Sequence, residues 1–227
     1  MRIAENVEML QLPGNSGPIY PVLLWDEQEA VLVDSGLPGQ LELLRAAVAS
    51  AGFALEEINT LILTHQDIDH IGCAAELAKL GLTVLAHEEE APYIEGRQPL
   101  IKLAELEARL PQLSEEQRIF YERLKVGASQ CCVKVDRLLR DGDTMSYCGG
   151  LQVIHTPGHT PGHIALLLQK SNIVLCGDAA NITDGAWCGA NPRYTNDMAQ
   201  AESSLQKLRA LQPAAAVCYH GGLLQLQ

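Results

Sequence analysis

Potential metal ligands stand at the ends of four separate segments of this chain. Residues 61–63, 153–154, 173–176 and 216–219 are largely apolar, as buried strands are. Each segment leads directly to histidine or aspartate: H-Q-D-I-D-H follows Thr64, H-T-P-G-H follows Ile154, G-D follows Cys176 and His220 follows Tyr219. Because strand ends on one side of an α/β sheet meet at a common edge, we expect these side chains to lie together. One such histidine is most simply a surface loop residue, but four such junctions predict a metal site.

The segment after Thr64 is the most specific of the four. It holds His65, Asp67, Asp69 and His70 within six residues. A strand or a helix could not turn all four side chains the same way, whereas a tight loop could aim one pair at one ion and the other pair at its neighbour. A helix N-cap would explain one aspartate, but not two aspartates and two histidines.

The rest of the pattern predicts a mixed α/β chain. Antiparallel strands are expected at residues 7–12, 19–25 and 30–33, and helices and strands then alternate. The expected helices cover residues 40–51, 73–80 and 195–211, and the later strands cover residues 60–63, 82–86, 151–155, 164–168, 173–176 and 214–219. We find no internal repeat or low-complexity linker, so we expect one domain over residues 1–227.

Residues 88–126 differ from the rest and predict a helical insertion. They are rich in Glu, Leu, Ala, Arg and Lys, and Leu103, Leu106 and Leu110 share one helical face before Pro111. Ser114 begins S-E-E-Q, a capping-box pattern that opens a second helix. A segment of this length cannot bury enough surface to fold alone, so we expect it to belong to the same domain and to wall the pocket.

The charge of the chain argues against nucleic acid as substrate or partner. The net charge is −12, and no cluster of Lys or Arg is present to replace the counterions of a phosphate backbone. No apolar run approaches the roughly 20 residues of a membrane helix, and no signal peptide is evident, so we expect a cytoplasmic protein without a membrane partner. The seven cysteines include no C-x-x-C pair and are expected to be reduced thiols; the adjacent pair Cys131 and Cys132 has no evident role.

Taken in order, these motifs resemble those of the metallo-β-lactamase superfamily of metallohydrolases. The resemblance is carried by V-D-S-G, T-H-Q-D-I-D-H-I-G, T-P-G-H-T-P-G-H, G-D and Y-H-G, which extend from Asp34 to His220. It implies a four-layered αβ/βα sandwich with a dinuclear metal site at one edge. It also implies a metal-dependent hydrolase that binds two divalent ions, with zinc expected.

The resemblance also implies a role for each motif residue. Asp34 would support the metal loops without binding a metal. Asp69 would also pass a proton from the nucleophile to the leaving group. The implied ligands are His65, Asp67 and His159 for the first metal, Asp69, His70 and His220 for the second, and Asp178 as the bridge between them.

One ligand departs from the family pattern. The usual motif is H-x-H-x-D-H, and Asp67 stands where the second histidine is expected. A carboxylate adds negative charge and a hard oxygen donor, so manganese or iron become alternatives to zinc. A glutamate at this place occurs in the flavodiiron branch, which carries a flavodoxin domain that this chain lacks. A hydrolase is therefore the preferred interpretation, with a non-hydrolytic diiron redox or metal-binding protein as the alternative.

Three other residues have two interpretations each, and a fourth has one. Tyr194 could donate a hydrogen bond to the substrate or be an ordinary loop residue. His163 could be a proton shuttle or a substrate contact, although a structural role is somewhat favoured. His155 fits a partner of a ligand or a loop histidine, and His87, which opens a Glu-rich helix, is expected on the surface.

The substrate class follows from the branches that the chain does not match. True β-lactamases lack the bridging aspartate, glyoxalase II-like thioesterases carry a C-terminal helical domain, and the nucleases carry additional domains or basic surfaces. A hydrolase of a small, uncharged or modestly polar ester, lactone or thioester, acting through a metal-bridging hydroxide, is the implied function. A phosphodiesterase of small molecules is a second alternative, and the apolar face of the insertion could also serve a homodimer.

Overall fold

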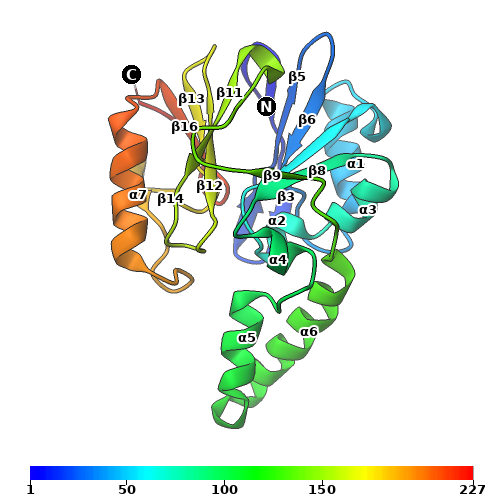
Figure 1. Cartoon of the computed structure of the whole chain (residues 1–227), viewed down its shortest axis with the longest axis vertical. Coiled ribbons are helices and arrows are strands. Elements are labelled where there is room, and N and C mark those ends of the chain that lie inside the picture. The colour runs from blue at the N-terminus through cyan, green and yellow to red at the C-terminus, as the bar shows by residue number, and fades with distance from the viewer. Residues whose placement is uncertain (227) are drawn as a thin grey trace.

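Among residues 1–226, which the computed structural model describes, two large β-sheets lie face to face (Figure 1). The first sheet has the order β1 (Arg2–Ala4), β2 (Val7–Met9), β5 (Val22–Trp25), β6 (Ala30–Val33), β7 (Thr60–Leu63), β8 (Thr83–His87) and β9 (Arg137–Leu139). The second has the order β10 (Thr144–Met145), β11 (Leu151–His155), β12 (Ile164–Leu168), β13 (Ile173–Leu175), β16 (Ala215–Cys218) and β17 (Gly222–Gln225).

Helices cover the outer face of each sheet. Helices α1 (Leu41–Ser50) and α3 (Ala74–Lys79) lie on the first sheet, and α7 (Met198–Ala210) lies on the second (Figure 1). A further short helix, α2 (Ile68–Ile71), follows β7. This order of helix, sheet, sheet and helix confirms the predicted four-layered αβ/βα sandwich.

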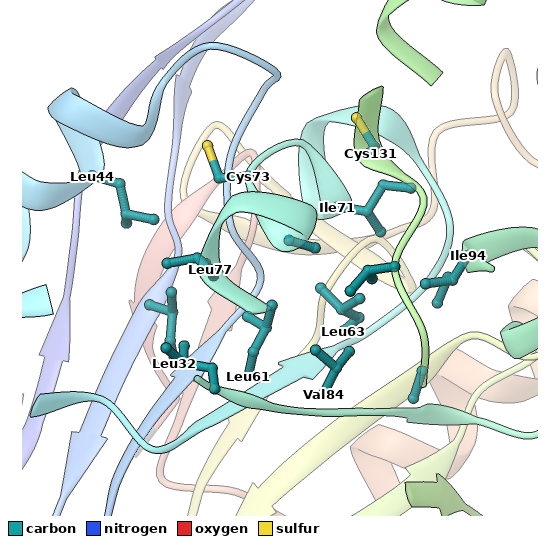
Figure 2. Close-up of a cluster of buried hydrophobic side chains, with 14 of the residues drawn as sticks. Leu32, Leu44, Leu61, Leu63, Ile71, Cys73, Leu77, Val84, Ile94 and Cys131 are labelled. Carbon is teal, nitrogen blue, oxygen red and sulfur yellow. The ribbon is translucent and has the colours of Figure 1, made fainter. Parts of the chain in front are cut away.

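Strand β7 shows why the central strands are apolar throughout. Leu61 and Leu63 point toward the helices and pack with Leu77, whereas Ile62 points toward the second sheet (Figure 2). Leu61, Ile62 and Leu63 are fully buried, so a polar side chain is disfavoured at these three positions on either face of β7. A strand buried on both faces reads as a continuous apolar run instead of an alternating one. Truncating such a leucine to alanine typically costs about 2–5 kcal/mol.

The direction of the strands decides where their ends meet. In the second sheet β11 and β13 each pair antiparallel with β12, and β16 runs parallel to β13. Consequently β11, β13 and β16 all end at the same edge of their sheet. The loop after β7 joins them there, because the Ile164 amide donates a hydrogen bond to the Thr64 carbonyl at 3.0 Å.

The N-terminal strands are shorter than predicted. The expected strands at residues 7–12 and 19–25 are each divided, and a separate hairpin of β3 (Leu12–Gly14) and β4 (Gly17–Ile19) stands between β2 and β5. Proline explains the break, since Pro13 faces Pro18 in this hairpin and Pro21 precedes β5. A proline has no N–H to donate to a neighbouring strand and is excluded from the middle of a sheet.

A helical hairpin projects from the sandwich between β8 and β9. It follows α4 (Ala91–Ile94) and consists of α5 (Ile101–Ala108), the 3₁₀ turn η2 (Leu110–Gln112) and α6 (Glu115–Cys131) (Figure 1). The predicted capping box is confirmed, because Ser114 Oγ accepts from the Gln117 amide at 3.2 Å and Gln117 Oε1 accepts from the Ser114 amide at 2.9 Å. Helix α6 runs beyond the predicted insertion to Cys131, whose thiol is buried, whereas Cys132 is exposed and both are free. No helix among residues 1–226 is both long and apolar enough to cross a membrane.

Candidate metal centre

Helix α2, which follows the loop after β7, is held in place by close contacts with residues 35–37. The Ser35 hydroxyl donates to the His70 carbonyl at 2.8 Å, and the Gly72 amide donates to the Gly36 carbonyl at 2.9 Å. A Cβ atom on Gly72 would stand 2.2 Å from the Leu37 carbonyl carbon, so only glycine permits this approach. The side chain of Asp67, which stands at the N-cap of α2, accepts no capping hydrogen bond and points to the site instead.

The structure brings all seven predicted ligands together. Their nitrogen and oxygen atoms form two groups, and within each group they lie within 4.8 Å of one another. The first group is His65, Asp67, His159 and Asp178, and the second is Asp69, His70 and His220.

Asp178 contacts both groups. Its Oδ2 atom lies 3.5 Å from His159 Nε2 and 3.3 Å from His220 Nε2, and its Oδ1 atom lies 3.5 Å from His70 Nε2. Asp67 contacts only the first group, where its Oδ2 atom lies 2.9 Å from His159 Nε2 and 3.2 Å from His65 Nε2. The carboxylate of Asp178 thus lies between the two groups, and the carboxylate of Asp67 lies within the first group.

Three buried ligand atoms indicate that the residues fit metal ions. Within the described part of the chain, His65 Nε2, His70 Nε2 and Asp178 Oδ1 are buried and have no hydrogen-bond partner. A buried polar atom without a partner costs about 1–3 kcal/mol, so three of them in one place call for a ligand. Imidazole and carboxylate donors suit zinc, manganese and iron.

Asp34 orients the loop from behind. It is 1% exposed, and its carboxylate accepts hydrogen bonds from the Thr64 amide at 2.9 Å, the Thr64 hydroxyl at 2.8 Å and His70 Nδ1 at 2.8 Å. The Thr64 oxygen lies 3.1 Å from His65 Nδ1 and accepts its proton. The Nδ1 atoms of both histidines are thus held by acceptors, so that in its neutral form each presents an unprotonated Nε2 to the site, the form that binds a metal.

The site's own charges shift the pKa values of its residues. Burial, together with the charge of His70, lowers the pKa of His65 to about 4, so this ligand is neutral at pH 7. Burial also disfavours a charged His70, but the charges of Asp34 and Asp178 outweigh it and raise the pKa well above the usual value. Metal binding needs the neutral imidazole and therefore releases a proton here. Burial and the charge of Asp178 raise the pKa of Asp69.

Lys102, on α5, reaches the site from the helical hairpin and was not expected there. Its ammonium group forms an ion pair with Asp67 and lies 3.2 Å from His159 Nε2. Burial disfavours the charged form, but the charge of Asp67 outweighs it and raises the Lys102 pKa. The sequence offered no signal for this residue, because a single lysine on an amphipathic helix is ordinary.

Glu90 was also missed. It is fully buried and accepts hydrogen bonds from the Gln66 amide at 2.9 Å and the Gly162 amide at 2.8 Å, so it ties the loop after β7 to the loop that carries His159. It lies within E-E-E, a run that is typical of an exposed helix end.

Tyr194 and His163 occupy different environments. Tyr194 is 45% exposed, and its ring lies 5.4 Å from the Lys102 ammonium on the solvent side of the site. His163 is fully buried, its Nε2 accepts from the Asp178 amide at 3.0 Å, and its Nδ1 donates to the Thr156 hydroxyl at 2.8 Å. With both ring nitrogens engaged, these contacts favour the structural interpretation of His163, in which it positions Asp178.

The prediction that His87 lies on the surface is wrong. Strand β8 extends to His87, which is 4% exposed and stacks on His155 with ring centroids 4.3 Å apart and ring planes 9° apart. Their ligand atoms and that of Glu89 lie within 4.8 Å of one another. Since lone pairs of nitrogen lie in the ring plane, the parallel rings direct them side by side and not toward one ion. His155 is the last residue of β11, and its Nε2 donates to the Pro161 carbonyl at 2.9 Å and not to a predicted ligand.

The chain is similar to known proteins along nearly its entire length. A model of the metallo-beta-lactamase superfamily matches residues 14–220. The chain is 26% identical over 230 residues to a probable metallo-hydrolase of Bacillus subtilis (strain 168), covering 95% of this chain and 80% of the relative. It is 27% identical over 223 residues to a hydroxyacylglutathione hydrolase of Bdellovibrio bacteriovorus, covering 95% of this chain and 67% of the relative. The structure of a metallo-beta-lactamase family protein from Thermus thermophilus is similar with a TM-score of 0.79 and 26% identity, covering 99% of this chain and 76% of that one.

Proposed function

The chain belongs to the metallo-β-lactamase superfamily of metal-dependent hydrolases. We propose that it uses two divalent ions, with zinc as the preferred metal, to hydrolyse a small ester, lactone or thioester. The observation that carries the proposal is the pair of ligand groups that share Asp178, with three buried ligand atoms left without hydrogen bonds. His65, Asp67 and His159 would hold one ion, Asp69, His70 and His220 the other, and Asp178 would bind both. When bound, the two ions would polarise the substrate carbonyl and lower the pKa of a water molecule.

The chain's own residues then handle the proton. Asp69 is 25% exposed and lies 3.4 Å from His220 on the solvent side of the site. From this position it can accept a proton from the attacking water and deliver it to the leaving group. The exposed Tyr194 side chain lies near Lys102, where its hydroxyl can donate a hydrogen bond to the substrate.

An acyl substrate is favoured over a phosphodiester by the similar proteins. Relatives at 26–27% identity are named hydroxyacylglutathione hydrolase, a name that describes hydrolysis of an acylated glutathione. A small-molecule phosphodiesterase and a diiron redox protein are the competing functions. The one feature in favour of a diiron redox protein is Asp67, because a carboxylate suits iron as well as zinc.

Metal analysis and a substrate panel test the proposal. The purified protein should contain two zinc or manganese ions per chain and hydrolyse a member of a panel of lactones, thioesters, carboxyl esters and phosphodiesters. Asp178→Asn should lose most activity and metal, whereas the same exchange at the exposed turn residue Asp184 should change neither. Iron with a visible charge-transfer band would support the redox function, and no turnover with any divalent metal would overturn the hydrolase proposal.

A further inference from the structure

Lys102 contacts the first ligand group although it lies outside every motif of the site. It reaches Asp67 and His159 from α5 of the helical hairpin. We propose that Lys102 binds a carboxylate group of the substrate, so that the enzyme prefers anionic acyl compounds to neutral ones. The inference rests on the proposed hydrolase function and adds the charge of the substrate, which the sequence analysis expected to be uncharged or modestly polar.

The ammonium group is not a substitute for the first metal ion. His65 Nε2 still lacks a hydrogen-bond partner with Lys102 in this position, so the first ligand group is incomplete without an ion. An ion bound by Asp67 and His159 would take the Asp67 oxygen that Lys102 now contacts, and it would repel the ammonium. Lys102 is then free to pair with another anion.

The side chain stays beside the site when this pair is broken. Its backbone is fixed in α5, which packs against α6, and α6 in turn packs against α2 of the metal loop. The ammonium lies 5.4 Å from the ring of Tyr194, and the Lys102 side chain is 26% exposed, so it borders both the ligands and solvent. Arg193 adds a second cation on this side, since its guanidinium lies 5.5 Å from the same ring.

The charge count favours an anion at this place. Two divalent ions bring four positive charges, which the three carboxylates of Asp67, Asp69 and Asp178 and the bridging hydroxide would just balance. Lys102 adds a further positive charge next to the first ligand group. The loaded site would therefore be a local cationic region on a chain whose net charge is −12, and a carboxylate is the group on a small acyl compound that such a region selects.

Binding of two matched probes tests the inference without turnover. Succinate and butyrate have the same chain length, and each offers one carboxylate to the metals, but only succinate has a second carboxylate for Lys102. Calorimetry on the two-zinc protein should show that succinate binds about tenfold more tightly than butyrate, a ratio between those of exposed and buried charge pairs. Lys102→Met should abolish this ratio, and Lys102→Arg should retain most of it. Lys125→Met, which removes a lysine from α6 of the same hairpin, should leave it unchanged.

Turnover provides the second readout. Succinyl and butyryl thioesters of N-acetylcysteamine place the charge on the acyl side, and the butyryl thioester of mercaptopropionate places it on the thiol side. Lys102→Met should raise the KM of at least one charged compound about tenfold more than it raises the KM of the neutral one. If a Lys102→Met protein with two zinc ions discriminates as the wild type does, or if the wild type binds both acids equally, the inference is wrong and Lys102 is only a counter-ion of Asp67. A wild type that hydrolyses no thioester or ester would instead refute the proposed function, while the ratio of succinate to butyrate binding would still decide the role of Lys102.

Discussion

Replacing Asp34 with asparagine tests how the second ligand group is oriented. Asp34 has a φ of +60°, a conformation in which asparagine is among the best tolerated residues, so the backbone should keep its shape. The asparagine oxygen can still accept from the Thr64 amide, and its NH₂ group then faces His70 Nδ1. Because that NH₂ group cannot accept a proton, His70 must carry its hydrogen on Nε2, the atom that faces Asp178.

The size of the effect follows from this single change of tautomer. Loss of the partner that orients a ligating histidine typically weakens metal binding about 10- to 100-fold, or about 1.4–2.7 kcal/mol. The loss should fall on the ion held by His70 and His220, and the ion held by His65 and His159 should be affected less. The metal-free protein should lose about 1–3 kcal/mol of unfolding free energy, because one charge-assisted hydrogen bond is replaced by a poorer contact.

Competition with a zinc-chelating dye, which resolves the two binding steps, measures the first effect, and urea unfolding of the metal-free protein measures the second. Asp184→Asn is the matched control, because Asp184 also has a positive φ (51°) but lies in an exposed turn. If Asp34→Asn weakens both ions equally, or neither, then Asp34 does not act through His70 and the reasoning fails.

Three further substitutions test other parts of the structure. Asp67→His restores the common ligand and removes the partner of Lys102, so metal competition should show a higher preference for zinc over manganese or iron; equal selectivity would mean that Asp67 is not a ligand. Gly72→Ala should lower the unfolding free energy in urea by about 3 kcal/mol, since its Cβ would meet backbone at 2.2 Å, whereas Gly189→Ala, with contacts no closer than 3.5 Å, should cost little. Burial and the nearby His155 lower the pKa of His87, so the unfolded chain binds the proton more readily, and stability should fall as the pH drops below the ordinary value of 6.5. His87→Phe should flatten this part of the curve of unfolding free energy against pH, and an unchanged curve would show that His87 does not cause the loss.

The sequence was sufficient for the ligand groups because the information there is local. His65 and Asp67 lie in the loop after β7, and Asp69 and His70 lie in α2 directly after it. The remaining predicted ligands each follow an apolar strand, so the fold had only to bring strand ends together. The same logic predicted the central strands, whose two buried faces require apolar residues throughout.

The residues that were missed depend on contacts between distant segments. Lys102 is 35 positions from Asp67, and Glu90 is 72 positions from Gly162, and in neither case does the local pattern differ from an ordinary helix surface. Strands such as β9, β10 and β14 (Ala180–Thr183) are only two to four residues long, too short for a periodic signal. His87 was assigned to a helix because the glutamates after it outweighed the apolar residues before it.

The position of Asp178 between the two ligand groups has a consequence for the order of folding. Each group joins parts of the chain that are far apart. In the first group 92 positions separate Asp67 from His159. In the second group 150 positions separate Asp69 from Tyr219, the residue before His220, whose hydroxyl donates to the Asp69 carbonyl. An ion bound at either place would close a chain loop of that length, and ends so far apart rarely meet in an unfolded chain. Neither binding site can exist until β13 and β16 have paired with the rest of their sheet. Metal uptake should therefore be a late event in the maturation of this protein, and the ions, once bound, would hold its two sheets together as cross-links.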